Sequence, residues 1–278
     1  MLHEIFPHTF SNLFQKKNKI NSADYVFCFQ EDTVLLKRDG TDFDIPLKQD
    51  LQYLSEDADF TYLFELNNTP CFIIWDKVDV NDTNLRYQDI SFFRTTNKKH
   101  VAWSSLVAYH LKLWYSQNKF CGKCGTLTQH KLEERALECP NCKTVYYPNI
   151  SPAIIVAILS RDKILLARNA NFPVAWYSLV AGYSDVGESL EETVVREVKE
   201  EVGIDVSNIR YYKSQPWPLS GSMMIGFIAD ADENQPIVID EKEITEAAWF
   251  TRDNVPLHPP SRSIAGEMIE KFKVGKLN

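Results

Sequence analysis

The chain has 278 residues, a formal net charge of −8 at pH 7 and an isoelectric point of about 5.3. This acidic balance argues against a broad basic surface for duplex nucleic acid, although it allows a local site for a nucleotide or an RNA end. Hydrophobic residues make up 44% of the chain and charged residues 24%, which is ordinary for a soluble globular protein. A chain of this length is expected to form about two domains, with room for a small insert.

No segment of the sequence predicts a membrane span or a targeting signal. The longest apolar run, Ala153–Leu159, is far shorter than the roughly 20 residues that a membrane-spanning helix needs. The first residues lack the apolar core of a secretory signal, and the last residues match no retention or peroxisomal signal. We therefore expect no membrane partner and a cytoplasmic location.

Residues 1–115 are predicted to form a β-rich domain that ends in a helix. Short apolar or alternating runs, separated by polar turns, indicate strands at 24–29, 33–38 and 70–76. Apolar residues then recur at helical spacing over 100–117, which predicts an amphipathic helix of about four turns.

Six cysteines fall into two classes. Cys28 and Cys71 are isolated within apolar runs, so they are expected to be buried and inert. The other four form two pairs, with two residues inside each pair and fourteen between the pairs: Cys121, Cys124, Cys139 and Cys142. In a reducing compartment this grouping favours a metal site over disulfides.

Residues 116–150 are predicted to form a zinc ribbon and a linker, because two residues between paired cysteines allow both thiolates to reach one ion. Four thiolates make a closed tetrahedral site, which implies one structural Zn²⁺ per chain. Cysteines without metal, a thiol–disulfide pair and a nucleic-acid-binding ribbon are alternative interpretations. The lysines and arginine of this segment are mixed with three glutamates, which favours a scaffold.

From Ser151 onward the pattern changes. Strands are predicted at 152–160, 163–169, 176–182, 222–230 and 246–251. One helix is predicted after Ser189, and a short second helix over 263–275. Strands mixed with a few helices, without strict alternation, predict an α+β or mixed α/β sandwich over 151–278.

The stretch Gly182–Ile204 carries six glutamates and one aspartate. Ser189 and Glu192 fit a capping box and Gly203 fits a C-terminal stop, so a helix is predicted between them. A stripe at every fourth position is expected to be buried: Leu190, Val194, Val198 and Val202.

Glu197, Glu200 and Glu201 share one face of this helix, where like charges repel by roughly 0.2–0.5 kcal/mol per pair. Arg196 is a single cation beside the cluster. A solvated acidic face is the ordinary interpretation of such a helix. A cation site is the alternative, because hard divalent ions take carboxylate oxygens as ligands.

The full pattern of this stretch is more specific than its charge. Glu188 follows six residues after Gly182, and Arg196 follows eight later to open the run Arg-Glu-Val-x-Glu-Glu-x-Gly-Ile. This pattern resembles the Nudix box, the signature of Nudix hydrolases. The resemblance implies a Nudix αβα sandwich and one or more catalytic Mg²⁺ or Mn²⁺ ions. It also implies hydrolysis of a nucleoside diphosphate linked to another group.

The resemblance implies roles for the helix residues of the box. Glu197 and Glu201 are expected to be the main ligands of the catalytic ions, and Glu200 to ligate or assist. Arg196 is expected to hold the glutamates in place by charge-assisted hydrogen bonds. Glu201 is our choice for the general base.

Four further positions follow from the same resemblance. The backbone carbonyl of Ala181 is expected to contact the catalytic metal, and Glu243 to be an additional metal ligand. Gly182 is expected to allow the turn of the loop. Glu188 is expected to orient the loop rather than to touch metal.

Downstream of the box, the stretch Ser-Gln-Pro-Trp-Pro-Leu-Ser-Gly-Ser at 214–222 resembles the SQPWPFPxS array of the NADH pyrophosphatase subfamily, which helps to bind the dinucleotide. This chain departs from the array at Leu219 and Ser220. The substrate-binding residues implied here are Gln215, Pro216, Trp217, Pro218, Leu219, Ser220, Gly221 and Ser222.

The subfamily resemblance implies five more substrate-binding residues. Tyr147 and Tyr183 would sandwich the nicotinamide, an arrangement that suits a flat ring because aromatic stacking contributes roughly 1 kcal/mol per ring. Glu134 would contact substrate, Ala265 lies in the tail that closes the pocket, and Arg94 is a further candidate contact. Members of the subfamily are homodimers with sites near the interface, so a homodimer is expected.

The expected function is metal-dependent hydrolysis of the pyrophosphate of NAD(H) to AMP and nicotinamide mononucleotide. Removal of NAD caps from RNA 5′ ends is a second activity implied by the subfamily. Two alternatives stay open: a Nudix hydrolase that prefers ADP-ribose or another nucleoside diphosphate derivative, and a non-catalytic nucleotide- or RNA-sensing module.

Overall fold

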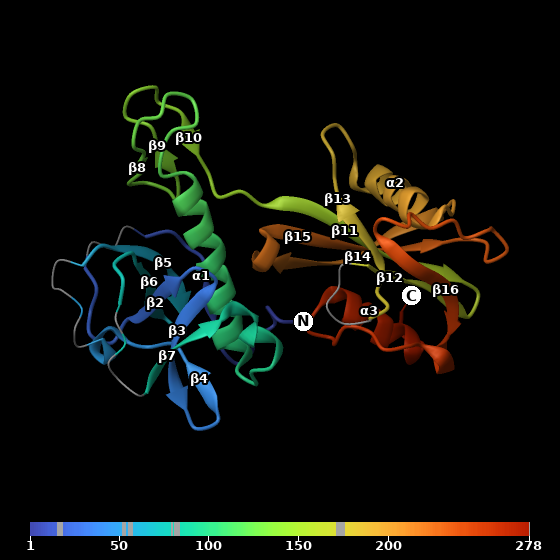
Figure 1. Ribbon diagram of the computed structural model, residues 1–278, viewed down its shortest axis with the longest axis horizontal. Coiled ribbons are helices and arrows are strands. Elements are labelled where there is room, and N and C mark those ends of the chain that lie inside the picture. Colours follow the sequence, from blue (N-terminus) through green and yellow to red (C-terminus); the bar gives the residue numbers. More distant parts are fainter. Residues whose placement is uncertain are drawn as a thin grey trace. The chain divides into compact units, whose positions relative to one another are not determined.

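The computed structural model describes residues 1–278 apart from 16–18, 52–53, 55–57, 79, 81–83, 171–175 and 278. Contacts within the chain separate two compact units (Figure 1). The N-terminal unit comprises 2–149 and 218–220, and the C-terminal unit comprises Met1, 150–217 and 221–278. Among the described residues, no helix is both long and apolar enough to cross a membrane.

A seven-stranded sheet with the order β1-β5-β6-β2-β3-β4 forms the main layer of the N-terminal unit, and β7 pairs with β3. Strands β2 and β6 run parallel, and the other pairs are antiparallel. Strands β2, β3 and β6 confirm the three strands predicted from the sequence. The strands are β1 (Phe10–Ser11), β2 (Tyr25–Gln30), β3 (Thr33–Asp39), β4 (Asp42–Asp44), β5 (Phe60–Leu66), β6 (Thr69–Ile74) and β7 (Leu85–Asp89).

Helix α1 (Lys99–Gln117) confirms the helix predicted over 100–117, but the prediction of an amphipathic helix was wrong. Its buried side chains lie all around the helix, because β2, β5 and the 3-10 helices η2 (Ile90–Arg94) and η3 (Pro218–Ser220) all contact it. A further 3-10 helix, η1, spans Lys48–Asp50.

The two isolated cysteines are buried, as expected. Burial raises the pKa of Cys28 to about 12 and that of Cys71 well above its ordinary value, which keeps both thiols protonated and unreactive. Between α1 and the C-terminal unit in sequence, a small three-stranded sheet has the order β10-β9-β8. Its strands are β8 (Gln129–His130), β9 (Leu137–Glu138) and β10 (Val145–Tyr146).

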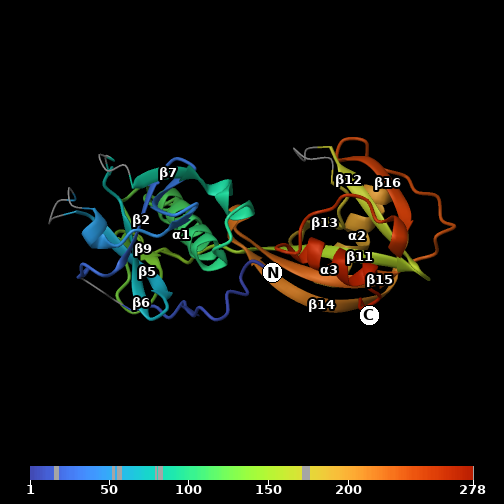
Figure 2. The ribbon, with the colours of Figure 1, turned by 90° about the horizontal axis from the view of Figure 1, so that it is seen from below.

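The C-terminal unit is built on a six-stranded sheet with the order β14-β15-β11-β12-β16, and β13 pairs with β11. Strands β11 and β15 are parallel, and the other pairs are antiparallel. Figure 2 shows β14 at the edge of this sheet, next to β15. The strands are β11 (Ser151–Ser160), β12 (Lys163–Asn169), β13 (Val180–Tyr183), β14 (Ser207–Trp217), β15 (Ser222–Asp230) and β16 (Ile244–Thr251).

Alternation along β11 divides the core of this unit into two layers. Ile154, Val156 and Ile158 pack with the valines of α2 (Leu190–Val202). Ile155 and Ala157 point to the other face and pack with α3 (Ile264–Lys273). Helices therefore cover both faces of the sheet (Figure 1), which confirms the predicted αβα sandwich. The 3-10 helix η4 (Arg252–Asn254) follows β16.

Candidate active site

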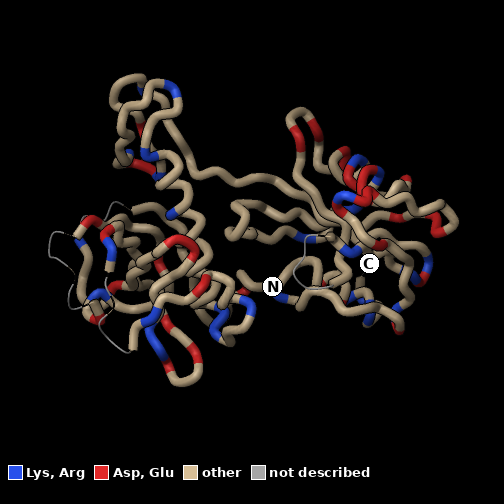
Figure 3. The backbone as a smooth tube through the Cα atoms, viewed as in Figure 1, with Lys and Arg blue, Asp and Glu red and all other residues tan. Residues whose placement is uncertain are grey.

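Helix α2 begins and ends where the sequence predicts. The Glu192 N–H donates to Ser189 Oγ at 3.2 Å, and the Ser189 N–H donates to Glu192 Oε2 at 2.7 Å, which completes the capping box. Gly203 takes a φ of 74° and ends the helix in the left-handed region that glycine adopts without strain. The three valines of the predicted stripe are fully buried and Leu190 is half-buried, so the stripe fixes the rotation of α2 and the direction of its acidic face. Acidic residues gather along α2 and the loop before it (Figure 3).

Arg196 is the hub of this acidic face. Its Nη1 donates to Glu197 Oε1 at 2.8 Å and to Glu200 Oε2 at 3.0 Å. Its Nη2 donates to the Tyr183 carbonyl and to Glu188 Oε2, both at 2.9 Å, and its Nε donates to Glu188 Oε1. One guanidinium therefore joins the end of β13, the loop and the helix.

Glu188 has the contacts that an orienting residue needs. Besides Arg196, its Oε2 accepts from Thr193 Oγ1 at 2.9 Å and from the Asp185 N–H at 3.1 Å. These hydrogen bonds, with Arg196 the largest contribution, lower the pKa of Glu188 to about 2. This carboxylate therefore already accepts hydrogen bonds from the loop and from helix α2, which leaves it little capacity to bind an ion.

Glu197 and Glu201 are the two largely buried carboxylates of this acidic face, and Glu201 is only 7% exposed. Burial first, and then the charges of Glu197 and Glu243, raises the pKa of Glu201 to about 8. Burial also raises the pKa of Glu197, although Arg196 opposes that effect. The influence of Glu243 on both groups places it near them, although it lies on the loop before β16.

This donor set fits a hard divalent cation. Glu197, Glu201 and Glu243 offer carboxylate oxygens, and the Ala181 backbone hydrogen-bonds to Glu201, which places the β13 backbone beside them. Glu200 is 59% exposed and bound to Arg196, so it lies at the rim. The carboxylates do not form a closed cage: among the described residues, only the four paired cysteines hold three or more ligand atoms within 4.8 Å of one another.

Gly182 does not have the role that the sequence analysis expected. It lies inside β13, opposite Ile154 of β11, and its φ is not positive. The glycine of this loop with a left-handed φ is Gly187, at 96°. The expectation that Gly182 forms the turn was therefore wrong, and the turn falls to Gly187.

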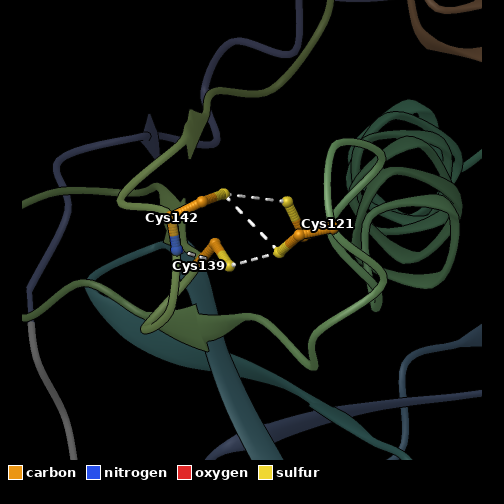
Figure 4. A group of neighbouring side chains, drawn as sticks. Cys121, Cys139 and Cys142 are labelled. Atoms are coloured by element: carbon orange, nitrogen blue, oxygen red, sulfur yellow. Dashed lines mark hydrogen bonds between the residues drawn. The ribbon is translucent and has the colours of Figure 1, made fainter.

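The sulfur atoms of the four paired cysteines all lie within 4.8 Å of one another. Figure 4 labels three of these residues, Cys121, Cys139 and Cys142. The sulfur atoms of Cys121 and Cys142 lie 3.4 Å apart, those of Cys124 and Cys139 3.4 Å, and those of Cys124 and Cys142 3.6 Å. Sulfurs about 2.3 Å from a central Zn²⁺ in a tetrahedron would be separated by about 3.8 Å. The described geometry therefore fits a closed zinc site with four thiolate ligands.

The surroundings of the first cysteine pair, Cys121 and Cys124, favour thiolates, the form that binds zinc, whereas the pKa of Cys139 is raised to about 11 in the absence of an ion. Hydrogen bonds to the Thr126 side chain and backbone lower the pKa of Cys124 to about 5. The Tyr146 hydroxyl donates to Cys121 Sγ at 3.2 Å and lowers the pKa of that thiol. Tyr146 also accepts from the Gly122 N–H at 2.9 Å, so it braces the first cysteine turn from β10.

The array at 214–222 is divided by its burial and contacts. Gln215 is only 1% exposed, and its side-chain amide donates to the Arg262 carbonyl at 2.9 Å and accepts from the Ile264 N–H at 2.7 Å. Gln215 thus hydrogen-bonds to the backbone at the start of α3, where Ala265 is buried in the core. The two departures from the family array, Leu219 and Ser220, lie in η3, which contacts α1. Pro218 and Ser222 are buried, and Pro216, Trp217 and Gly221 are half-buried.

The other predicted substrate residues lie on separate elements. In the N-terminal unit, Tyr147 is 54% exposed, and its hydroxyl donates to Glu134 Oε1 at 3.2 Å, so the ribbon brings these two together. In the C-terminal unit, Tyr183 is 52% exposed at the end of β13. Arg94 is exposed at the end of η2, and its guanidinium lies 4.9 Å from the centre of the Phe93 ring.

Three supporting residues were absent from the sequence predictions. Thr193 binds Glu188, Tyr146 binds Cys121, and Lys131 Nζ lies 2.8 Å from Glu134 Oε1. Thr193 occupies a position between fixed residues of the box, and Tyr146 lies next to Tyr147. Their spacing relative to their partners carries no general signal, because each contact depends on how loops and strands come together.

Comparison with known proteins agrees with this geometry. The NUDIX domain profile matches residues 150–272, and the NADH pyrophosphatase zinc ribbon domain profile matches 116–147. A NAD-capped RNA hydrolase NudC of Pseudomonas aeruginosa is 44% identical over 165 residues, which are 59% of each chain. The NAD-capped RNA hydrolase NudC of Citrobacter koseri is 42% identical over 187 residues, 66% of this chain and 72% of that protein.

The match therefore spans about three fifths of the Pseudomonas protein and nearly three quarters of the Citrobacter protein. A solved Nudix hydrolase from Nitrosomonas europaea superposes with a TM-score of 0.48 at 22% identity, covering 57% of this chain and 94% of that one. The box geometry, the four-cysteine ribbon and the matched sequences lead to one conclusion: the chain belongs to the Nudix hydrolase family, with an NADH pyrophosphatase zinc ribbon ahead of its Nudix domain.

Proposed function

We propose that this protein hydrolyses the pyrophosphate of NAD(H) to AMP and nicotinamide mononucleotide, and that it also removes NAD caps from RNA 5′ ends. One observation carries the proposal. Two largely buried carboxylates, Glu197 and Glu201, lie on one face of α2 beside the end of β13. The relatives named NAD-capped RNA hydrolase NudC support the choice of substrate.

The position of each residue in the site suggests its role in the reaction. Glu197, Glu201, Glu243 and the Ala181 carbonyl would hold the catalytic ions, which we propose to be Mg²⁺ or Mn²⁺. When bound there, such ions would neutralise the diphosphate and would supply a nucleophilic water at neutral pH. Arg196 fixes Glu197 and Glu200, and Glu201 remains our choice for the general base because it is the innermost carboxylate.

Two aromatic residues support recognition of the nicotinamide. Tyr183 and Tyr147 keep half of their surface exposed, so each ring is available to stack on a flat base. Glu134 lies against the Tyr147 hydroxyl and offers an acceptor for a polar substituent. In the array, we propose that the half-buried Trp217 contacts substrate, whereas the buried Gln215 would act through α3.

The surroundings of the reaction are also proposals. We propose a division into 1–115, 116–150 and 151–278, a homodimer as the active assembly, and the cytoplasm as the location. A reducing compartment keeps the four ribbon cysteines available as thiolates for zinc, which supports the last point. Arg94 stays a proposed substrate contact.

Product analysis by chromatography tests the proposal. The zinc-loaded protein would be incubated with NADH, NAD⁺, ADP-ribose and an NAD-capped RNA, each with Mg²⁺ or Mn²⁺, beside a Glu201→Gln control. We expect AMP and nicotinamide mononucleotide from the dinucleotides and 5′-monophosphate RNA from the capped RNA. The control is expected to lose at least about a hundredfold in rate, because it removes a carboxylate from the ion site.

The same experiment separates the alternatives. Cleavage of ADP-ribose alone would assign the protein to another substrate class within the family, and the departures at Leu219 and Ser220 would then gain importance. Binding of nucleotides without cleavage of any of them, in saturating Mn²⁺, would favour a sensing module.

A further inference from the structure

The space beside Gly182 is filled by another residue. A Cβ atom built on Gly182 would lie 2.0 Å from Cδ of Glu197, 2.1 Å from its Oε1 and 2.3 Å from its Oε2. Non-bonded carbon atoms normally approach to about 3.5–4.0 Å. The Glu197 carboxylate therefore occupies the place that any other side chain at position 182 would take.

We propose that Gly182 is a positioning residue for Glu197: its missing side chain creates the space in which this carboxylate lies against the β13 backbone. The inference rests on the proposed function, because that function makes the Glu197 carboxylate a ligand of the catalytic ion. It replaces the expected role of Gly182 in a turn, since the residue lies in a paired strand.

Two independent constraints then hold Glu197. From the helix side, Arg196 Nη1 donates to Glu197 Oε1 at 2.8 Å. From the strand side, the absence of a side chain at Gly182 leaves room for the carboxylate beside the backbone next to Ala181, whose carbonyl is the proposed metal contact. The pairing of β13 with β11 fixes that backbone, because Ala181 lies opposite Ile155 and Gly182 opposite Ile154.

The nature of the conflict determines what a methyl group at position 182 would do. The atoms in its way belong to the end of a flexible side chain and not to the backbone. Rotation of Glu197 relieves the conflict without separating β13 from β11. We therefore expect Gly182→Ala to fold normally and to misplace the carboxylate.

The test uses the zinc-loaded protein and two readouts other than activity. Crystal structures of the parent protein and of Gly182→Ala, both without catalytic ions, would locate the Glu197 carboxylate. Titration with Mn²⁺, followed by electron paramagnetic resonance, would measure ion affinity. We expect the carboxylate to leave its place and the Mn²⁺ dissociation constant to rise at least about tenfold, while the unfolding temperature stays close to that of the parent.

Two further variants sharpen the result. Glu197→Asp shortens the side chain by one methylene, so in the Gly182→Ala background it should weaken Mn²⁺ binding by less than it does alone. Gly226→Ala also crowds this sheet but away from the acidic helix, because its Cβ would lie 2.7 Å from Ile264 Cδ1, 3.2 Å from the Lys213 carbonyl oxygen and 3.4 Å from Met268 Sδ. We expect this control to leave Mn²⁺ affinity unchanged.

The outcomes are distinguishable. A carboxylate that keeps its place in Gly182→Ala, or one that moves with no change in Mn²⁺ affinity, would overturn the inference. So would loss of the fold in Gly182→Ala when Gly226→Ala folds. If the parent protein itself binds no Mn²⁺, the proposed function fails, and the crystal structures alone still decide whether Gly182 makes room for Glu197.

Discussion

At the scale of single residues, the candidate site depends on one guanidinium. Arg196 reaches Glu188, Glu197, Glu200 and the Tyr183 carbonyl at the same time. A planar group with five N–H donors can serve four partners, whereas a lysine ammonium offers three donors from one point. The site thus requires an arginine and not merely a positive charge.

We predict that Arg196→Lys lowers kcat at least about tenfold, because Glu197 loses its fixed partner while the charge is retained. Steady-state kinetics on NADH, with circular dichroism to confirm the fold, would measure this. Lys199→Arg, an exposed change on the same helix, is the matched control and should be close to the parent. Full activity in Arg196→Lys would show that charge alone is sufficient.

At the scale of elements, Gln215 joins β14 to the start of α3. The nitrogen and the oxygen of its side-chain amide each make a hydrogen bond, and the side chain is buried. We predict that Gln215→Ala lowers the free energy of unfolding by about 1–3 kcal/mol, because it leaves the Ile264 N–H and the Arg262 carbonyl without these partners. Urea denaturation would measure the loss. A raised KM with unchanged stability would instead show that the amide serves substrate directly.

The zinc ribbon is the second element whose stability can be tested. Its strands have two residues each, so they cannot bury a core of their own, and the metal is expected to supply the missing stability. We predict that Cys124→Ser lowers zinc content below one ion per chain and increases hydrogen exchange over 116–147. Mass spectrometry reports both quantities.

The matched control for the zinc prediction is Cys28→Ala. Cys28 is buried in β2 and is not part of the sulfur cluster, so this variant should keep one zinc per chain. Equal zinc content in Cys124→Ser and the parent would contradict the four-cysteine site.

At the scale of the whole molecule, half-buried histidines make the N-terminal unit sensitive to acid. Partial burial is the largest cause that lowers the pKa of His100 and of His110. The unfolded chain, with an ordinary histidine pKa of about 6.5, therefore binds protons that the folded unit excludes. The stability gained from neutral histidines is present above that pH and is lost as the pH falls through it toward the lowered folded values.

We predict that the urea concentration at the unfolding midpoint of the N-terminal unit decreases when the pH is lowered from 7.5 to 5.5. Zinc content would be verified at each pH. His110→Gln is the useful variant, because a glutamine amide can still donate to the Asn149 carbonyl but does not titrate. This variant should lose less stability on acidification. An identical pH dependence in both proteins would exclude a contribution from His110.

Short-range patterns predicted much of the fold and of the site. Strands β12 and β15, the start of α2, its valine stripe and the Gly203 stop all depend on neighbours a few residues apart, which the sequence displays directly. The same holds for the two cysteine pairs, whose ligand atoms the structure gathers within 4.8 Å. Strand β14 was not among the predicted strands, since it has no clear alternation and several exposed residues.

The family of this protein can be recognised from its sequence, because the box, the capping residues and the cysteine spacing are local features of one chain segment each. Three features became evident only in the folded chain: the reason that Gly182 is a glycine, the burial of Gln215 against α3, and the covering of α1 on all sides. Each of these depends on atoms that are distant in sequence and meet through packing. Steric exclusion and buried hydrogen bonding act between such atoms, and no spacing rule along the chain encodes them.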